Sequence, residues 1–155
     1  MSLVTLADAK AHLRVEEAGE DTLIQAYVNA AELFAVNYLG RNVYADQAAM
    51  NTAISGVAAA LSAATTAYVA AVEAAASIAS DVESGIAMDV ADQAYQAAQQ
   101  TAKRTYSGIV LNDAIKSAIL LIVGHLFLNR EASADRAMDE VPFGVYALLQ
   151  PFRVY

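Results

Sequence analysis

The two histidines, His12 and His125, have the most versatile chemistry in the chain, because an imidazole can bind a metal or transfer a proton near neutral pH. Neither belongs to a metal-binding pattern, since no H-x-x-x-H or H-E-x-x-H spacing occurs. The chain contains no cysteine, which excludes thiolate ligands, thiol nucleophiles and disulfides. We therefore expect His12 on a helix surface and His125 in a packed helix, and we predict no metal site.

Other catalytic and binding motifs are also missing. No G-x-G-x-x-G, P-loop or G-x-S-x-G pattern occurs, so we predict no enzyme activity and no cofactor. The formal net charge of −8 argues against sequence-specific nucleic-acid binding, because neutralising phosphates requires clustered Lys and Arg. An enzyme or small-molecule binder with a helical pocket is one alternative, which a ligand-induced rise in melting temperature would support.

The composition indicates an all-α fold in a single domain. Hydrophobic residues make up 57% of the 155 residues, and many of them are alanine, the strongest helix former. Only two prolines and seven glycines interrupt the chain, and no Asn-Gly or Asp-Gly hairpin signal occurs. These features favour long helices in close contact.

Residues 1–42 predict two helices. Thr5 is suited to cap the first, with Asp8 in the capping-box position. Glu20 and Asp21 place negative charge at the start of the second, and Gly40 is suited to end it. The second helix has one apolar face at helical spacing, formed by Ile24, Tyr27, Val28, Ala31, Phe34, Ala35 and Tyr38.

Residues 43–108 differ in kind, because about a third of them are alanine. Helical spacing continues for many turns, and Ser84-Gly85 is the most obvious break. We therefore predict two antiparallel helices joined near Ser84-Gly85, with Tyr68, Tyr95 and Tyr106 as packing residues along their seam.

Residues 109–155 begin with a predicted cap at Asn112 or Asp113. The helix that follows is apolar all round, so we expect both its faces to be buried, either centrally in the domain or against another subunit. Its most apolar window, of about 11 residues, is too short to span a bilayer, which needs about 20. The sequence therefore predicts no membrane partner.

Pro142 stops any helix there, and residues 144–149 are expected to form a short last helix that ends before Pro151. The aromatic tail that follows leaves two alternatives open. Phe152 and Tyr155 either fill a groove on their own domain or dock on another chain, and docking is slightly favoured because aromatic residues are enriched at interfaces.

Two stretches of this sequence resemble phage head–tail connector (adaptor) proteins. The N-terminal stretch comprises Leu6, Ala9-Lys10, His12-Leu13-Arg14, Glu20-Asp21, Leu23-Ile24 and Ala30-Ala31. The C-terminal stretch comprises Ile115-Lys116, Ala118-Ile119-Leu120, His125-Leu126, Asn129-Arg130-Glu131, Val141-Pro142, Gly144-Val145, Leu148-Leu149, Pro151 and Arg153. The resemblance covers about 85 to 90 residues, at the two ends of the chain.

The resemblance implies a structural virion protein of a tailed double-stranded DNA phage or prophage. Its subunits are expected to form a ring, often of twelve copies, between the portal protein and a tail-completion or stopper protein. DNA would pass through the lumen without sequence-specific binding. Assembly would take place in the host cytoplasm. Residues 1–42 and 109–155 would then form the core of the domain, and residues 43–108 an inserted helical hairpin.

The resemblance also suggests residues for subunit or partner contacts, which are Arg130, Glu131, Pro142, Leu148, Leu149, Phe152, Arg153 and Tyr155. For Arg130, a contact within the subunit, with residues 141–151, is favoured over a contact with a neighbouring subunit, and a solvated pair of Arg130 and Glu131 at the helix end is a further alternative. The alternative function is a cellular helical adaptor that binds one protein partner through its alanine-rich hairpin. Portal, capsid and terminase genes upstream of this one would favour the phage function.

Overall fold

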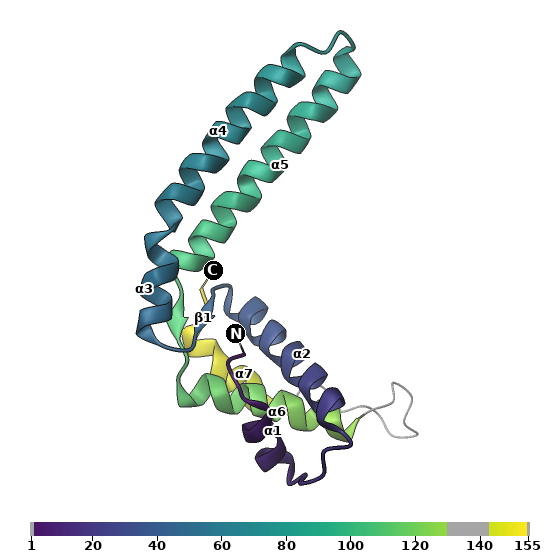
Figure 1. The fold of residues 1–155 in the computed structure, drawn as a ribbon, viewed down its shortest axis with the longest axis vertical. Helices are drawn as coiled ribbons and strands as arrows, with labels where there is room; N and C mark the ends of the chain where they lie inside the picture. The colour runs from purple at the N-terminus through teal and green to yellow at the C-terminus, as the bar shows by residue number, and fades with distance from the viewer. Residues whose placement is uncertain (1, 130–142, 155) are drawn as a thin grey trace. The chain divides into compact units, whose positions relative to one another are not determined.

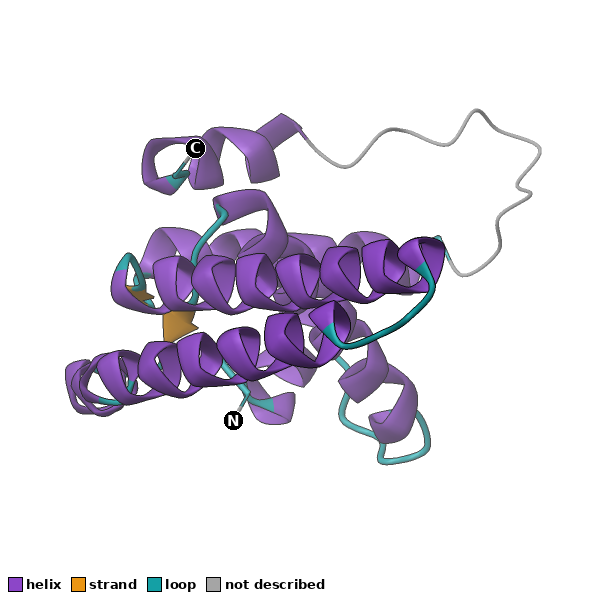
Figure 2. Cartoon of the chain, turned by 90° about the horizontal axis from the view of Figure 1, so that it is seen from above, coloured by secondary structure: helices purple, strands orange, loops and turns teal. Residues whose placement is uncertain are grey.

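The computed structural model describes residues 2–129 and 143–154, and the chain divides into two units (Figure 1). The first unit comprises Met1–Gln47 and Ile109–Tyr155 and is called the helical body here. The second, Ala48–Gly108, is called the hairpin. Most described residues lie in helices, as Figure 2 shows, which confirms the all-α prediction.

The elements follow in a simple order. The helical body contains α1 (Leu6–Leu13), α2 (Asp21–Leu39), β1 (Val43–Tyr44), β2 (Ile109–Val110), α6 (Asp113–Leu128), α7 (Phe143–Leu149) and the 3-10 turn η1 (Gln150–Phe152). Helix α3 (Gln47–Ser55) begins at the boundary between the units, and α4 (Val57–Ala76) and α5 (Asp81–Tyr106) follow in the hairpin.

The predicted caps of the first helices are confirmed. The Thr5 hydroxyl accepts a hydrogen bond from the Asp8 N–H at 3.1 Å, and the Asp8 carboxylate accepts one from the Thr5 N–H at 3.4 Å. The Thr5 hydroxyl and Lys116, whose Nζ lies 3.1 Å from Asp8 Oδ2, hold the pKa of Asp8 below its usual value. Gly40 ends α2 in the left-handed conformation, at φ +68°.

Helix α6 lies at the centre of the helical body. Its fully buried residues are Ile115, Ala118, Ile119, Ile122 and Val123. It packs against α2, α7 and α1, so apolar residues on several sides of it are covered within one subunit. Of the two alternatives for this all-round apolar helix, the central position in the domain is the one that the structure shows.

Two short parallel strands join the ends of the segment that contains the hairpin. Val43 pairs with Ile109 and Tyr44 with Val110, and the Leu111 N–H donates to the Tyr44 carbonyl at 2.7 Å. These strands were not predicted from the sequence, because two residues are too few to show the alternation by which strands are recognised.

The predicted break in the hairpin at Ser84-Gly85 is wrong. Helix α4 ends at Ala76 and α5 begins at Asp81, so Ser84 and Gly85 both lie inside α5. Ser80 caps α5 by accepting a hydrogen bond from the Glu83 N–H at 3.4 Å. Ser80 and Glu83 have the S-x-x-E spacing that marks a helix start, so the sequence does contain a signal for the true start of α5.

The position of Gly85 generates a stability prediction. A Cβ added at Gly85 would meet no atom within 4 Å, and the residue lies in a helix interior. Gly85→Ala is therefore expected to raise the free energy of unfolding by about 0.5–1 kcal/mol, since alanine loses less backbone entropy on folding. Chemical denaturation followed by circular dichroism measures the change, and a destabilised variant would contradict this helix boundary.

Candidate functional site

The two histidines lie in structural positions. The Nε2 of His12 is 3.5 Å from the point where a Cβ on Gly124 would lie, so the imidazole packs over this glycine of α6. The carbonyl of His125 accepts a hydrogen bond from the Asn129 side chain at 3.0 Å. Among residues 2–129 and 143–154, no three His, Asp or Glu side chains are grouped so that they could hold a metal ion.

The last described residues fold back onto their own subunit. Val145 and Leu149 are fully buried in the core of the helical body, and Leu148 and Phe152 pack against it half-buried. An aromatic cluster continues this contact, with the ring of Tyr146 lying 5.4 Å from Tyr38 and 6.3 Å from Phe34.

Polar contacts fix the same segment to α2. The Tyr38 hydroxyl donates to Gln150 Oε1 at 2.5 Å, and the guanidinium of Arg153 lies 4.9 Å from the centre of the Tyr38 ring. The Val154 N–H donates to the Leu39 carbonyl at 2.9 Å. Phe152, Arg153 and Val154 therefore lie against their own domain, which agrees with the first of the two alternatives for Phe152, whereas Tyr155 lies outside the described residues.

The residues predicted for subunit or partner contacts differ from one another in their burial. Leu149 belongs to the buried core of its own subunit, whereas Arg153 is exposed. Arg130, Glu131, Pro142 and Tyr155 lie outside the described residues. An interface role for Arg153 stays a proposal, which is taken up below.

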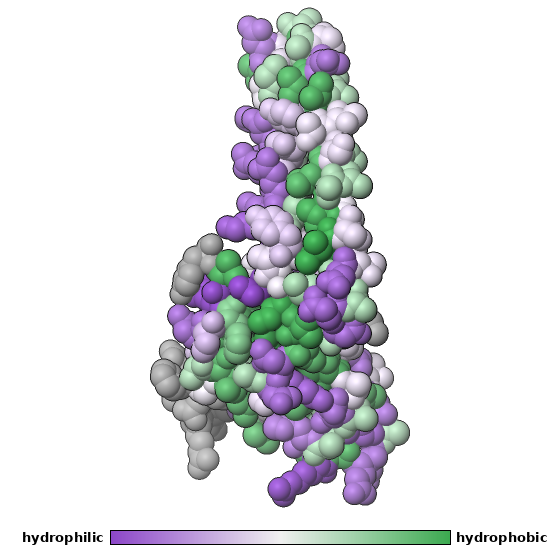
Figure 3. Space-filling model, turned by 90° about the vertical axis from the view of Figure 1, so that its left-hand side faces the viewer, coloured by the Kyte–Doolittle hydropathy of each residue, from purple (hydrophilic) through white to green (hydrophobic). Residues whose placement is uncertain are grey.

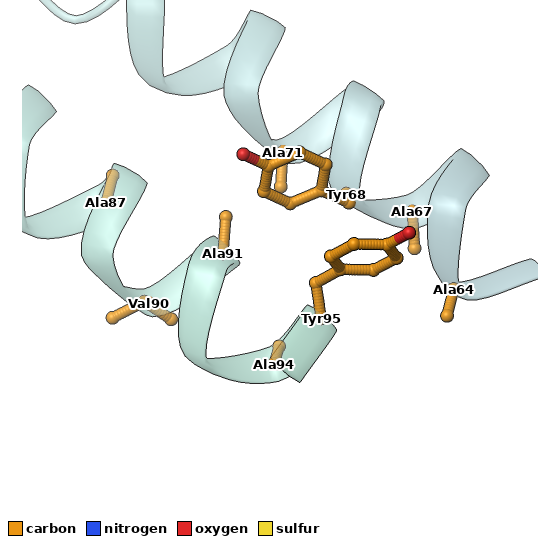
Figure 4. A pocket seen from close by; sticks show the side chains of 9 residues that line it. All are labelled: Ala64, Ala67, Tyr68, Ala71, Ala87, Val90, Ala91, Ala94 and Tyr95. Atoms are coloured by element: carbon orange, nitrogen blue, oxygen red, sulfur yellow. The ribbon is translucent and has the colours of Figure 1, made fainter. Parts of the chain in front are cut away.

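The hairpin has a second group of side chains that are candidates for a contact with another protein chain. The rings of Tyr68 on α4 and Tyr95 on α5 stack with centroids 5.0 Å apart, which agrees with their prediction as seam residues (Figure 4). The hydroxyl of Tyr68 donates to the Asp92 carboxylate, and this hydrogen bond raises the pKa of Tyr68 above its usual value. Tyr106, the third predicted seam residue, is 57% exposed.

Alanines line a shallow groove beside these tyrosines. One hollow of about 290 Å³ is bordered by Ala64, Ala67, Ala71, Ala87, Val90, Ala91 and Ala94, together with both tyrosine rings (Figure 4). A second hollow of about 390 Å³ is bordered by Ala53, Gly56, Val57, Ala60, Ala98, Thr101, Ala102 and Thr105. Both hollows lie between α4 and α5, so one face of the hairpin is almost wholly apolar.

The outer surface of the hairpin is divided by polarity. Val82, Ile86 and Val90 on α5 are 73%, 60% and 60% exposed. Figure 3 shows hydrophilic side chains gathered along one edge of the hairpin and apolar ones over much of the rest of the face in view. Exposed apolar rows of this kind mark contact sites on proteins.

By length and composition alone, residues Gln47–Ala76 could also cross a membrane. An 18-residue window within this range has a mean hydropathy of 1.5, to which alanine contributes much, and no residue of that window is buried. Helix α5 packs along α4 and carries Asp81, Glu83, Asp89, Asp92, Lys103 and Arg104. Charged side chains are costly in lipid, so the hairpin suits a protein partner better than a bilayer core.

The helical body has exposed apolar residues of its own. Leu33 on α2 is 62% exposed and Leu128 at the end of α6 is 81% exposed. Leu33 borders a shallow hollow of about 300 Å³ with Leu3, Asn29, Glu32, Val36 and Val43. One oxygen of Glu32 accepts hydrogen bonds from the Ser2 hydroxyl and the Leu3 and Val4 N–H groups, at 2.7 to 2.8 Å, and so fixes one wall of this hollow.

A family model described as phage gp6-like head-tail connector protein matches residues 3–89, which is more than half of the 155 residues. The matched range runs from α1 into α5 and stops before the C-terminal stretch of the resemblance. It also runs through residues 43–89 of the segment that was predicted to be an insertion. No curated protein and no solved structure matches the chain significantly.

The tail contact generates a prediction at Gly40. A Cβ added there would lie 2.6 Å from the carbonyl oxygen of Val154, and the positive φ disfavours other residues. Gly40→Ala is expected to lower the free energy of unfolding by about 1–3 kcal/mol, measured by denaturant titration. Gly19→Ala is the matched control, since its Cβ would meet nothing within 4 Å. Equal stability of the two variants would contradict the tail position.

Proposed function

The chain belongs to the phage gp6-like head–tail connector family, and on that premise we propose that its copies form a ring between the portal and the tail of a virion. The ring joins the portal protein on one side to a tail-completion protein on the other. It acts as a structural part of the particle, with DNA passing through its lumen. Twelve copies are the number that the resemblance implies.

The observation that carries this proposal is the family match over residues 3–89. The helical body supports it in one respect, because its described core is closed by its own helices and leaves Leu33 and Leu128 exposed for contacts. A core made within one subunit allows that subunit to fold before it assembles.

The charge of the subunit fits a channel for DNA. With a formal net charge of −8 and nine Lys and Arg residues, a ring of these subunits has an acidic character. An acidic lumen repels phosphates, so it lets DNA slide instead of holding it. We propose a passive conduit for this reason.

Electron microscopy and native mass spectrometry of the purified chain, alone and mixed with the portal protein of its own phage, test the proposal. We expect rings whose mass is about twelve times that of the 16.3 kDa subunit. A chain that stays monomeric at high concentration and forms no ring with the portal would overturn it.

Arg153 provides a finer test of the subunit contact. Because the chain is acidic, we propose that this exposed arginine faces carboxylates of a neighbouring copy in the ring. Arg153→Glu is expected to lower the fraction of assembled rings, and loss of the contact with the Tyr38 ring contributes about 0.5–1 kcal/mol to any loss of stability, which denaturant titration measures separately. Arg14→Glu, at another exposed arginine, is the control and should assemble normally.

A further inference from the structure

The hairpin lacks a core of its own. All its residues are described, and its buried apolar residues are three alanines, Ala75, Ala91 and Ala102. A methyl group buries little apolar area, so the contact between α4 and α5 contributes little hydrophobic stabilisation. The larger apolar side chains of α5 instead point into solvent. Another surface that covers them would supply the missing burial.

Two rows of side chains on the hairpin complement each other in size. The valine–isoleucine row on α5 consists of Val82, Ile86 and Val90, spaced four residues apart along one ridge. The alanine row on α4 consists of Ala63, Ala67, Ala70 and Ala74, all of them exposed. Bulky ridges pack into the shallow surface that small side chains leave, as in ordinary helix packing.

Two residues of each row also lie at matching levels along the hairpin. The Ser84 hydroxyl donates to the Ala75 carbonyl at 2.9 Å, which fixes how α5 runs back along α4. By this register Ile86 is level with Ala74, and Val90 with Ala70. Two copies placed side by side in the same direction therefore bring the valine–isoleucine row of one against the alanine row of the other.

The two rows themselves are uncharged. The hairpin carries five acidic residues, Glu73, Asp81, Glu83, Asp89 and Asp92. Glu73 lies beside the alanine row and Asp89 beside the valine–isoleucine row, so their repulsion weakens the contact at low salt. Asp92 lies on the other side of the hairpin, where Tyr68 donates to it. By the 100° step between helical residues, both rows turn toward the face with the alanine-lined groove. Repeated pairing therefore curves a line of copies toward that face.

We propose that the valine–isoleucine row of each copy docks on the alanine row of the next copy, as a second subunit contact in the ring. The valine–isoleucine row is about 12 Å long, so a strip of about 12 Å by 10 Å gives about 120 Å² for one contact. A stable pair needs about 800 Å² per partner, so the contact is too small to hold two isolated copies together. In a ring each copy uses both rows, and the two contacts add to those of the helical body.

Paired cysteines test the contact, because the natural chain contains none. The full-length double variant Ile86→Cys/Ala74→Cys is oxidised over a range of concentrations up to about 1 mM and run on a denaturing gel without reductant. We expect a ladder of covalent multimers that extends beyond the dimer. The control Ser62→Cys/Gln99→Cys places two exposed cysteines at matching levels on the other side of the hairpin, and it should give at least tenfold less of the ladder.

The inference rests on the proposed ring, and the outcomes separate the two. Rings with no more ladder than the control would overturn this contact and leave the ring standing. A ladder that stops at the dimer would indicate a closed two-fold pair and overturn the contact as a ring interface. Failure of the chain to form rings even with its portal would overturn the proposed function, and a long ladder from that same chain would still support pairing of the rows.

Discussion

The helical body depends on covering α6. This helix carries apolar side chains on every side, and leaving any side in water would forgo roughly 1.5–3 kcal/mol for each large residue exposed. Helices α1, α2 and α7 pack around it from separate parts of the chain. The caps at Thr5 and Asn112 and the left-handed Gly40 begin or end the helices of this arrangement, so local signals and global packing agree there.

Unlike the helical body, the hairpin has no core of large buried apolar side chains. The hairpin contains the longest helix of the described chain, yet its buried side chains are alanines, and the stacked rings of Tyr68 and Tyr95 add an aromatic contact to its seam. Alanine gives it high helix propensity without a thick core. The body is therefore held together by burial, whereas the hairpin is held by local propensity and a narrow seam. A part built in this way gains most from an external partner.

Sequence patterns predicted the fold well where one strong signal acted alone. The capping box at Thr5 and the apolar face of α2 were predicted correctly, since both depend on a single helix. The position of the hairpin turn was not, because Ser84-Gly85 was weighted as a break although Ser80 and Glu83 form the stronger start signal. The tail was ambiguous for a physical reason. Aromatic residues and arginine serve equally to fill a groove on the same chain and to dock on another, so only the fold distinguishes the two.

Closure of the core within one subunit has a consequence for assembly. A body whose described core needs no neighbour can fold as a monomer, and copies with a net charge of −8 repel one another until salt or a template brings them together. The proposed contact of about 120 Å² is too weak to overcome that repulsion between two copies alone. In the proposed ring every copy makes this contact twice, and the last copy to enter joins two neighbours at once, which raises its effective concentration. Small contacts of this kind therefore favour complete rings over isolated dimers.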